Sequence, residues 1–195
     1  MSQVKPYSPE GSKKEQVAEM FNAISPKYDA LNRILSVGID QIWRRKTVRE
    51  IRTTGATQIL DVATGTADLA LALADGIPGS HVVGVDISAG MLDVGRQKVR
   101  ARRKDDRVRL DLGDGEQLPY DDASFGAITV AFGVRNFENL EQGLRDMHRV
   151  LQPGGTLAVL EFSQPTSWPF RPLYLFYFKN ILPRIGRLIS KDASA

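Results

Sequence analysis

Short apolar runs alternate with helical patterns of hydrophobic residues through the middle of the chain. Helical spacing fills the gaps between runs that have the length of strands. Strands that alternate with helices are typical of βαβ units, and near-continuous apolar strands are typical of a parallel sheet that is covered on both faces. The pattern therefore predicts an α/β fold with a doubly wound, mostly parallel sheet. We expect strands at residues 58–62, 81–85, 108–112, 127–132 and 156–162, with helices at 67–74, 88–103 and 136–151.

Three helices are predicted before the first strand. Apolar residues at helical spacing indicate the first one over residues 14–24. Ser25 and Pro26 have the order of an N-cap followed by a first-turn proline, so they predict the start of a second helix. Asp40 is expected to cap a third helix, which ends at Gly55.

These patterns divide the chain into four regions. Residues 1–13 are expected to form a flexible tail, residues 14–55 a helical lid and residues 56–163 the catalytic core. The last region, 164–195, is rich in aromatic residues and is expected to be helical.

Composition excludes several kinds of chemistry. The chain has no cysteine and only two histidines, so disulfides, thiolate metal sites and cysteine nucleophiles are excluded and a histidine-built metal centre is not expected. No secretory signal and no apolar run long enough to span a bilayer are found, which predicts a cytoplasmic protein.

Positive charge gathers in two places. The net charge is +3, yet residues 96–109 alone hold eight basic and two acidic side chains. Such a cluster is typical of a site for nucleic acid or for an anionic membrane, but it also describes an ordinary solvated helix face. A second basic stretch covers residues 44–52, and the same alternatives apply to it.

The loop after the first strand is a candidate cofactor site. Ligands of doubly wound sheets bind at the carboxyl ends of the strands, where the strand order reverses. Gly65 permits a tight turn there, and we expect the Asp61 carboxylate to point into the pocket. A fixed negative charge suits a sulfonium ligand and repels a pyrophosphate, which favours S-adenosylmethionine over NAD. A purely structural turn is the alternative.

Three further segments extend this candidate site. Asp86 ends the second strand, 21 residues after Gly65, where the acid that binds a ribose usually lies. Met91 can flank an adenine or pack in the core, while Asp114 and Gly115 follow the third strand and can reach the adenine edge. The fourth strand is followed by Arg135 and Asn136, which are placed to meet a methyl acceptor, although an ordinary surface loop is the alternative.

The chain resembles the ubiquinone/menaquinone C-methyltransferase family from about residue 14 to its end. The resemblance lies in Tyr-Asp-x-x-Asn at 28–32, LDVATGTAD at 60–68, FGVRN at 132–136 and RVLQPGGTLAVLEFS at 149–163. It implies a Class I S-adenosylmethionine-dependent methyltransferase fold. The sheet of that fold usually has seven strands, so we expect the last two to be missing through truncation of the C-terminus. It also implies that Thr66, Asp86, Asp114 and Gly115 contact S-adenosylmethionine.

The family's activity gives the expected reaction. The resemblance implies that Arg135 lies near a quinol ring and that Tyr28, Asp29 and Asn32 cover the acceptor pocket. The expected reaction is C-methylation of a prenylated quinol, foremost demethylmenaquinol to menaquinol. A ubiquinone-pathway benzoquinol, a nucleic-acid methyltransferase and a non-catalytic cofactor-binding protein are the alternatives.

The resemblance also bears on partners. An insoluble prenyl tail keeps the substrate in a membrane, so we expect peripheral association with the inner face of the cell membrane. The aromatic segment at 168–178 and the basic stretch at 44–52 are candidates for this contact. A homodimer is compatible with the sequence, whereas no nucleic-acid partner and no metal are expected.

Overall fold

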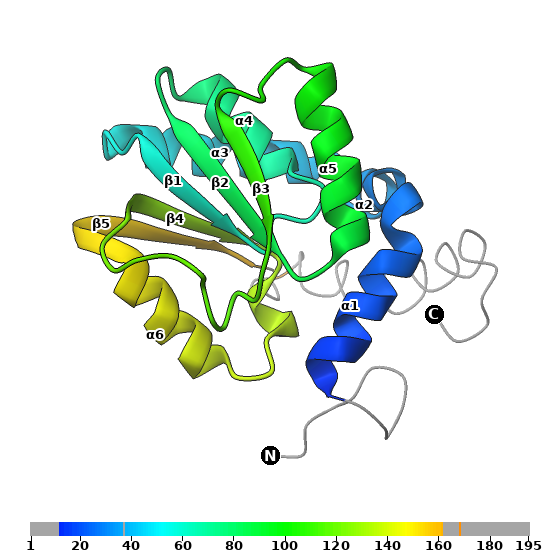
Figure 1. The fold of residues 1–195 in the computed structure, drawn as a ribbon. Helices are drawn as coiled ribbons and strands as arrows, with labels where there is room; N and C mark the ends of the chain where they lie inside the picture. The colour runs from blue at the N-terminus through cyan, green and yellow to red at the C-terminus, as the bar shows by residue number, and fades with distance from the viewer. Residues whose placement is uncertain (1–11, 37, 162–167, 169–195) are drawn as a thin grey trace.

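The computed structural model describes residues 12–36, 38–161 and 168. Its centre is a parallel sheet in the order β3-β2-β1-β4-β5 (Figure 1). The first three strands extend the sheet to one side of β1 and the last two to the other side, so the strand order reverses between β1 and β4. The strands are β1 (Gln58–Val62), β2 (His81–Asp86), β3 (Val108–Leu112), β4 (Phe125–Ala131) and β5 (Leu151–Leu160). The predicted α/β fold with a doubly wound parallel sheet is confirmed.

Helices cover both faces of the sheet. The helices are α1 (Lys13–Ile24), α2 (Tyr28–Leu35), α3 (Ile39–Thr53), α4 (Asp68–Gly76), α5 (Ala89–Ala101) and α6 (Leu140–Val150). Alternate side chains of β1 serve the two layers: Ile59 packs with α3, α4 and α5, whereas Leu60 packs with α6. Parallel strands buried on both faces explain why the sequence shows continuous apolar runs.

Several boundaries differ from the sequence-based prediction. Ser25 does not cap α2, because it lies inside a short 3-10 helix, Ser25–Lys27, and its hydroxyl donates to the Asn22 carbonyl. Gly38, with φ +76°, is the N-cap of α3, and Asp40 instead pairs with Arg44 from within the first turn.

The segment between β4 and β5 is also divided differently from the prediction. A 3-10 helix at Val134–Asn136 precedes α6, and the Asn139 side chain caps α6 by accepting from the Gln142 amide. The two strands expected to be missing, and the aromatic segment apart from Trp168, lie outside the described residues.

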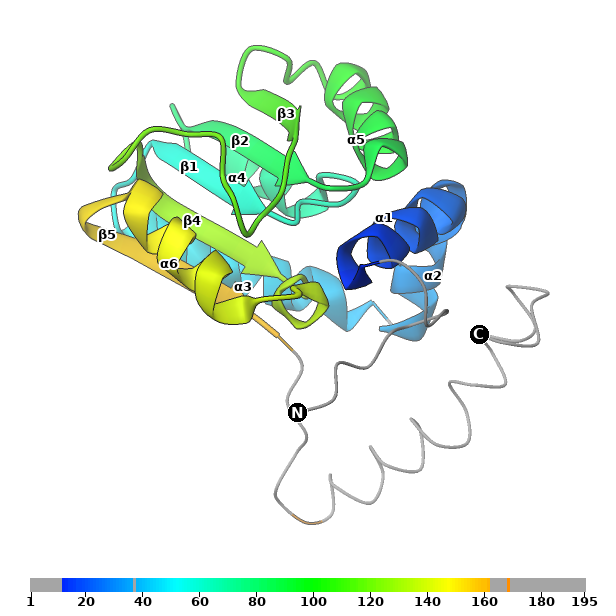
Figure 2. The ribbon, with the colours of Figure 1, turned by 60° about the horizontal axis from the view of Figure 1, so that its bottom comes forward.

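Helices α1 and α2 lie across the carboxyl ends of the strands (Figure 2). At the C-terminal end of α1, Asn22 Oδ1 accepts from the Ser88 hydroxyl at 2.8 Å and from the Gly90 amide at 2.9 Å. A Cβ at Gly90 would lie 3.0 Å from Ser25 Oγ and 3.1 Å from Asn22 Oδ1. The missing side chain at Gly90 therefore allows the close approach that holds α1 against the start of α5.

A chain of ion pairs fastens α2 and α3 to the core. Lys98 Nζ on α5 lies 2.7 Å from Asp29 on α2 and 2.5 Å from Asp68 at the start of α4. Asp68 also pairs with Arg44 on α3 at 2.7 Å, and Arg44 with Asp40 at 2.8 Å. Two cations thus pair with three acids from three helices. We call these five residues, Asp29, Asp40, Arg44, Asp68 and Lys98, the Lys98 network.

The basic segment 96–109 uses most of its cations within the fold. Arg107 donates to the carbonyls of Ile77 and Ser80, and Lys98 belongs to the network above. Arg96, Arg102, Lys104 and Arg109 also have acidic partners within 4 Å. The structure therefore favours a role of this cluster within the fold over a binding site for nucleic acid or for an anionic membrane.

Within the described residues, no helix combines the length and apolar character that crossing a bilayer requires.

Candidate active site

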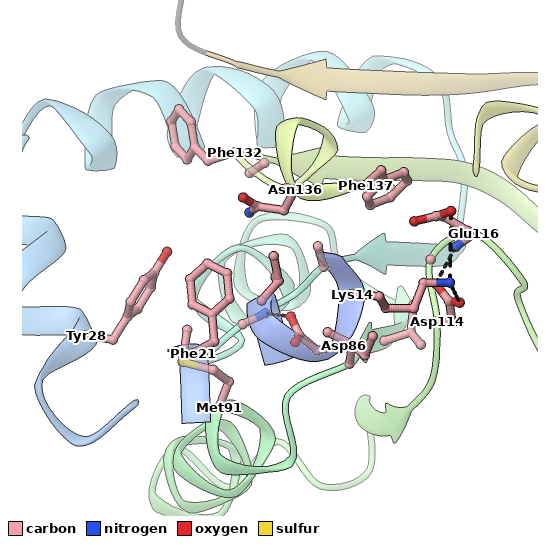
Figure 3. A pocket seen from close by; sticks show the side chains of 18 residues that line it. Lys14, Phe21, Tyr28, Asp86, Met91, Asp114, Glu116, Phe132, Asn136 and Phe137 are labelled. Carbon is pink, nitrogen blue, oxygen red and sulfur yellow. Dashed lines mark hydrogen bonds and ion pairs between the residues drawn. The ribbon is translucent and has the colours of Figure 1, made fainter. Parts of the chain in front are cut away.

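A cavity opens at the carboxyl ends of β1, β2 and β4, where the strand order reverses (Figure 3). The loops after β1, β2, β3 and β4 form its floor, and α1 and α2 form its cover. Its position is the one at which doubly wound sheets bind their ligands.

Asp61 lies beneath the first loop and does not line the cavity. Its two carboxylate oxygens accept from the hydroxyls of Thr64 and Thr129, each at 2.6 Å, and the residue is 1% exposed. Burial raises its pKa to about 6, against the two hydroxyl donors, which lower it. The expectation that this carboxylate points into the pocket is therefore wrong, because β1 turns it inward toward β4.

Asp86 ties two loops of the cavity together. Its Oδ2 accepts from the Gly65 amide at 2.7 Å and its Oδ1 from the Ser88 amide at 2.8 Å. Burial raises the pKa of Asp86, opposed by the backbone amides that donate to it. Asp86, Gly65 and Met91 all line the cavity, so the structure brings these three predicted residues together.

The loop after β3 supplies the next part of the wall. Asp114 and Gly115 line the cavity as the sequence suggested. A Cβ at Gly115 would lie 2.9 Å from side-chain atoms of both Phe137 and Val62, so only glycine fits there.

Lys14 was not predicted from the sequence. Its ammonium forms an ion pair with Asp114 across the mouth of the cavity, and it lies 4.0 Å from Glu116 Oε2. The neighbouring Lys13 donates to the carbonyls of Arg135 at 3.1 Å and Phe137 at 2.6 Å. The first turn of α1 therefore contacts the loops after both β3 and β4.

Glu116 is a second residue that the sequence analysis missed. It is 6% exposed, and its two oxygens accept from the amides of Glu138 at 2.7 Å and Asn139 at 3.0 Å. The carboxylate thus joins the loop after β3 to the start of α6. A Glu two residues after Asp114 was the only available signal, and its partners lie more than twenty residues away.

Aromatic side chains form the opposite half of the cavity. Tyr28, Phe21 and Phe132 line it, with Tyr28 and Phe21 packed edge to face at 6.0 Å between ring centres. Burial raises the pKa of Tyr28, which Arg135 opposes, so the phenol is protonated at neutral pH. The Asn136 side chain also lines this half.

Arg135 lies at the rim of the aromatic half. Its guanidinium pairs with Glu161 at 2.6 Å, and its Cζ lies 5.9 Å from the centre of the Phe132 ring. The side chain is not among those that line the cavity, whereas its neighbours Gly133 and Asn136 are.

Asp29 and Thr66 lie behind the cavity wall. The Thr66 hydroxyl is 2.5 Å from Asp29 Oδ1 and 2.9 Å from Lys98 Nζ, and neither residue lines the cavity. Asp29 is a member of the Lys98 network, and Thr66 hydrogen-bonds to two of its members. The resemblance implies that Thr66 contacts S-adenosylmethionine and that Asp29 covers the acceptor pocket, but neither side chain lines the cavity in this structure.

Among residues 12–36, 38–161 and 168, no group of three or more His, Asp or Glu side chains could hold a metal ion.

The chain is similar to curated methyltransferases over nearly its whole length. It is 45% identical to the demethylmenaquinone methyltransferase of Bacteroides fragilis (strain ATCC 25285) over 192 residues, which is 98% of this chain and 78% of that protein. It is 47% identical to the ubiquinone/menaquinone biosynthesis C-methyltransferase UbiE of Geobacter sp. (strain M21), over 92% of this chain and 77% of that protein.

A solved structure shares the fold. The crystal structure of the [4+2]-cyclase SpnF superimposes with a TM-score of 0.68 at 23% identity, over 82% of this chain and 63% of that one. At the level of families, residues 10–195 match the ubiE/COQ5 methyltransferase family. The chain therefore belongs to the ubiE/COQ5 methyltransferase family, and it is an enzyme of the methyltransferase class.

Proposed function

We propose that this chain transfers a methyl group from S-adenosylmethionine to a ring carbon of a prenylated quinol, and that demethylmenaquinol is the acceptor. The relatives named for demethylmenaquinone and menaquinone methylation support this acceptor. The observation that carries the proposal is a single cavity with two unlike halves. One half presents carboxylates and glycine backbone, and the other presents aromatic rings and an amide.

The polar half fits the methyl donor. S-adenosylmethionine supplies a methyl group that is already activated by the positive sulfur. Asp86 holds two amides and keeps further lone pairs for ribose hydroxyls, while Asp114 and Gly115, on the cavity wall, can reach an adenine edge through a carboxylate and a backbone amide. Met91 lines the same cavity as an apolar side chain, with its Cε 3.5 Å from the position of a Cβ at Gly65.

The aromatic half fits a planar quinol. Phe21 and Phe132 provide flat apolar surfaces, and the protonated Tyr28 hydroxyl can donate to a quinol oxygen. Asn136 offers both a donor and an acceptor on the same side. Arg135, at the rim, adds a positive charge that stabilises an ionised quinol oxygen.

The chemistry then needs little more than positioning. Ionisation of one hydroxyl makes the ring carbon electron-rich, and that carbon attacks the methyl group in line. The carbon–methyl bond forms as the sulfur–methyl bond breaks, the electron pair goes to sulfur, and the ring proton is released to solvent. Holding the reacting atoms at roughly 3–3.5 Å supplies much of the rate. Helices α1 and α2 act as the lid that excludes water.

An acceptor with a prenyl tail resides in a lipid bilayer, so we also propose that the protein associates peripherally with the inner face of the cell membrane. At the membrane surface the active site would lie where the prenylated substrate is found, and S-adenosylmethionine would reach it from the aqueous side.

The decisive experiment is turnover with labelled S-adenosylmethionine and two acceptors, demethylmenaquinol and a prenylated methoxy-benzoquinol. Methyl transfer to the ring carbon of demethylmenaquinol at the higher kcat/KM is expected. A preference for the benzoquinol would move the assignment to the ubiquinone pathway, to which the name of the Geobacter relative also refers. Cofactor binding without transfer to either quinol would overturn the proposal.

A further inference from the structure

One face of α3 is exposed and strongly basic. The exposed residues of this helix are Ile39, Ile42, Arg45, Lys46, Arg49, Glu50, Arg52 and Thr53. They recur at three- and four-residue spacing, so they share one side of the helix. Four of them are cations and only Glu50 is an acid. We call this surface the α3 face.

The cations of the α3 face are not used inside the protein. Arg44, their neighbour on the same helix, turns inward and pairs with Asp40 and Asp68. In contrast, Arg45, Lys46, Arg49 and Arg52 have no ion pair among the described residues. In the other basic segment, 96–109, most of the cations form ion pairs with acids or hydrogen bonds to carbonyls of the fold. The charge that remains available for a partner is therefore concentrated on α3.

The α3 face also has an apolar end, and that end lies next to the cavity. Ile42 is 61% exposed and Ile39 is 43% exposed, both in the first turn of the helix. Trp43, between them and the cavity, packs against Phe132 with 5.9 Å between ring centres, and Phe132 lines the aromatic half. A surface in contact with Ile39 and Ile42 would thus lie beside the aromatic half of the cavity, where we propose that the acceptor binds.

We propose that the α3 face docks onto an anionic lipid surface, with Ile39 and Ile42 inserted among the lipids and Arg45, Lys46, Arg49 and Arg52 at the headgroups. The combination of exposed isoleucines with unpaired cations on one helical side is the pattern of an interfacial helix, and it complements the negative charge of such a surface. The inference rests on the proposed function only in taking the acceptor to be membrane-bound.

The test is co-sedimentation of the full chain with vesicles of phosphatidylcholine containing about 30% phosphatidylglycerol. The native chain is expected to bind these vesicles and to bind pure phosphatidylcholine much more weakly. Arg45→Gln/Arg49→Gln should lower the partition constant by about tenfold or more, because each basic residue close to an anionic surface contributes substantially. Ile42→Ser should lower it a few-fold even at high salt, since apolar insertion is not screened.

Arg100→Gln/Arg103→Gln is the matched control. Both residues are exposed, lie on the other basic segment and have no ion pair among the described residues, and the double variant removes the same two charges. It should bind vesicles as the native chain does. An equal loss in the control, no loss in Arg45→Gln/Arg49→Gln, or binding to an RNA oligonucleotide in place of vesicles would overturn the proposal.

A second assay separates this inference from the proposed function. With an acceptor that lacks the prenyl tail and is dissolved in water, Arg45→Gln/Arg49→Gln should keep the native kcat/KM. With demethylmenaquinol embedded in the anionic vesicles, the same variant should lose activity in parallel with binding. If the native chain methylates neither acceptor, the proposed function fails, while the vesicle binding still decides the docking surface.

Discussion

The backbone amide of Gly65 donates a 2.7 Å hydrogen bond to Asp86 Oδ2, although Gly65 lies in the loop after β1 and Asp86 is the last residue of β2. The other oxygen of Asp86 accepts from the Ser88 amide. One carboxylate thereby fixes the loop after β1 against the loop after β2, at the place where the sheet reverses its strand order. Under the proposed function, the shape of the donor half of the cavity and its affinity for a ribose depend on the same group.

Replacing Asp86 by alanine should weaken binding of S-adenosylmethionine by about tenfold to a hundredfold. The reason is the loss of charge-assisted hydrogen bonds worth about 1.5–3 kcal/mol in all. Isothermal titration calorimetry measures the effect, with Asp93→Ala as control, because Asp93 is an exposed acid on α5 outside the cavity. An unchanged affinity in Asp86→Ala would remove Asp86 from the ribose site.

Arg135→Ala should lower kcat for quinol methylation by about tenfold to a hundredfold, because a positive charge near the developing charge stabilises the transition state. Affinity for S-adenosylmethionine should stay within a factor of about three. Arg145→Ala is a matched control, since Arg145 also pairs with a glutamate, Glu141, but lies on α6 away from the cavity. A collapse of cofactor affinity would instead assign Arg135 to the donor half.

Lys14→Met should loosen α1, because this lysine joins the helix to Asp114 across the cavity. The pair is partly exposed, so we expect amide exchange in residues 13–24 to accelerate by only about two- to fivefold. Hydrogen exchange followed by mass spectrometry measures this change. Lys27→Met, at an exposed lysine outside α1, should leave the exchange of α1 as it is, and an equal effect there would remove the special role of Lys14.

Asp61 should make the protein less stable as the pH rises. Burial raises the pKa of this acid from 3.8 to about 6, so between these values the folded chain holds a proton that the unfolded chain has lost. The stability contribution of the group is full below about pH 4, decreases up to about pH 6 and is then constant, a loss of about 3 kcal/mol.

Asp61→Asn removes this titration without removing the side chain. The difference in free energy of unfolding between variant and native chain should therefore shift by about 2–3 kcal/mol in favour of the variant from pH 4 to pH 7. Urea unfolding at several pH values measures it. A difference that does not change with pH would show that Asp61 ionises normally.

Arg103→Gly should stabilise the chain by about 1 kcal/mol. Arg103 follows α5 with φ +51°, and the Lys104 amide donates to the Val99 carbonyl, which is the arrangement of a helix end that favours glycine. Thermal unfolding should show a higher Tm for this variant. Arg100→Gly, inside the same helix, should instead destabilise by about 1 kcal/mol, so two identical substitutions three residues apart should have opposite effects.

The local parts of the fold could be predicted from the sequence because they depend on local patterns. Apolar runs and helical spacing located the five strands and the helices between them, and Gly65, Asp86, Met91, Asp114 and Gly115 follow strands whose ends must meet at one edge of the sheet. A position after a parallel strand is enough to place a residue near the cavity.

The direction in which a side chain points is harder to predict from the sequence. Asp61 has the sequence position of a pocket residue, yet hydroxyls of Thr64 and Thr129 draw its carboxylate beneath the loop. Lys14 finds its partner one hundred residues away at Asp114, and no periodicity reports such a contact. Long-range pairing decides both cases.

The Lys98 network has a consequence for how such a chain can change over evolutionary time. Each of its two cations is shared between acids on different helices, so the loss of one acid still leaves each cation a partner. The loss of Lys98 or Arg44, in contrast, leaves the partly buried carboxylate of Asp29 or Asp40 without its ion-pair partner. A neutral replacement at Lys98 or Arg44 becomes tolerable only when Asp29 or Asp40, respectively, has already changed. We therefore expect positions 29 and 98 to vary together, and positions 40 and 44 to vary together, among descendants of this chain, so that the attachment of the N-terminal helices is inherited as one unit.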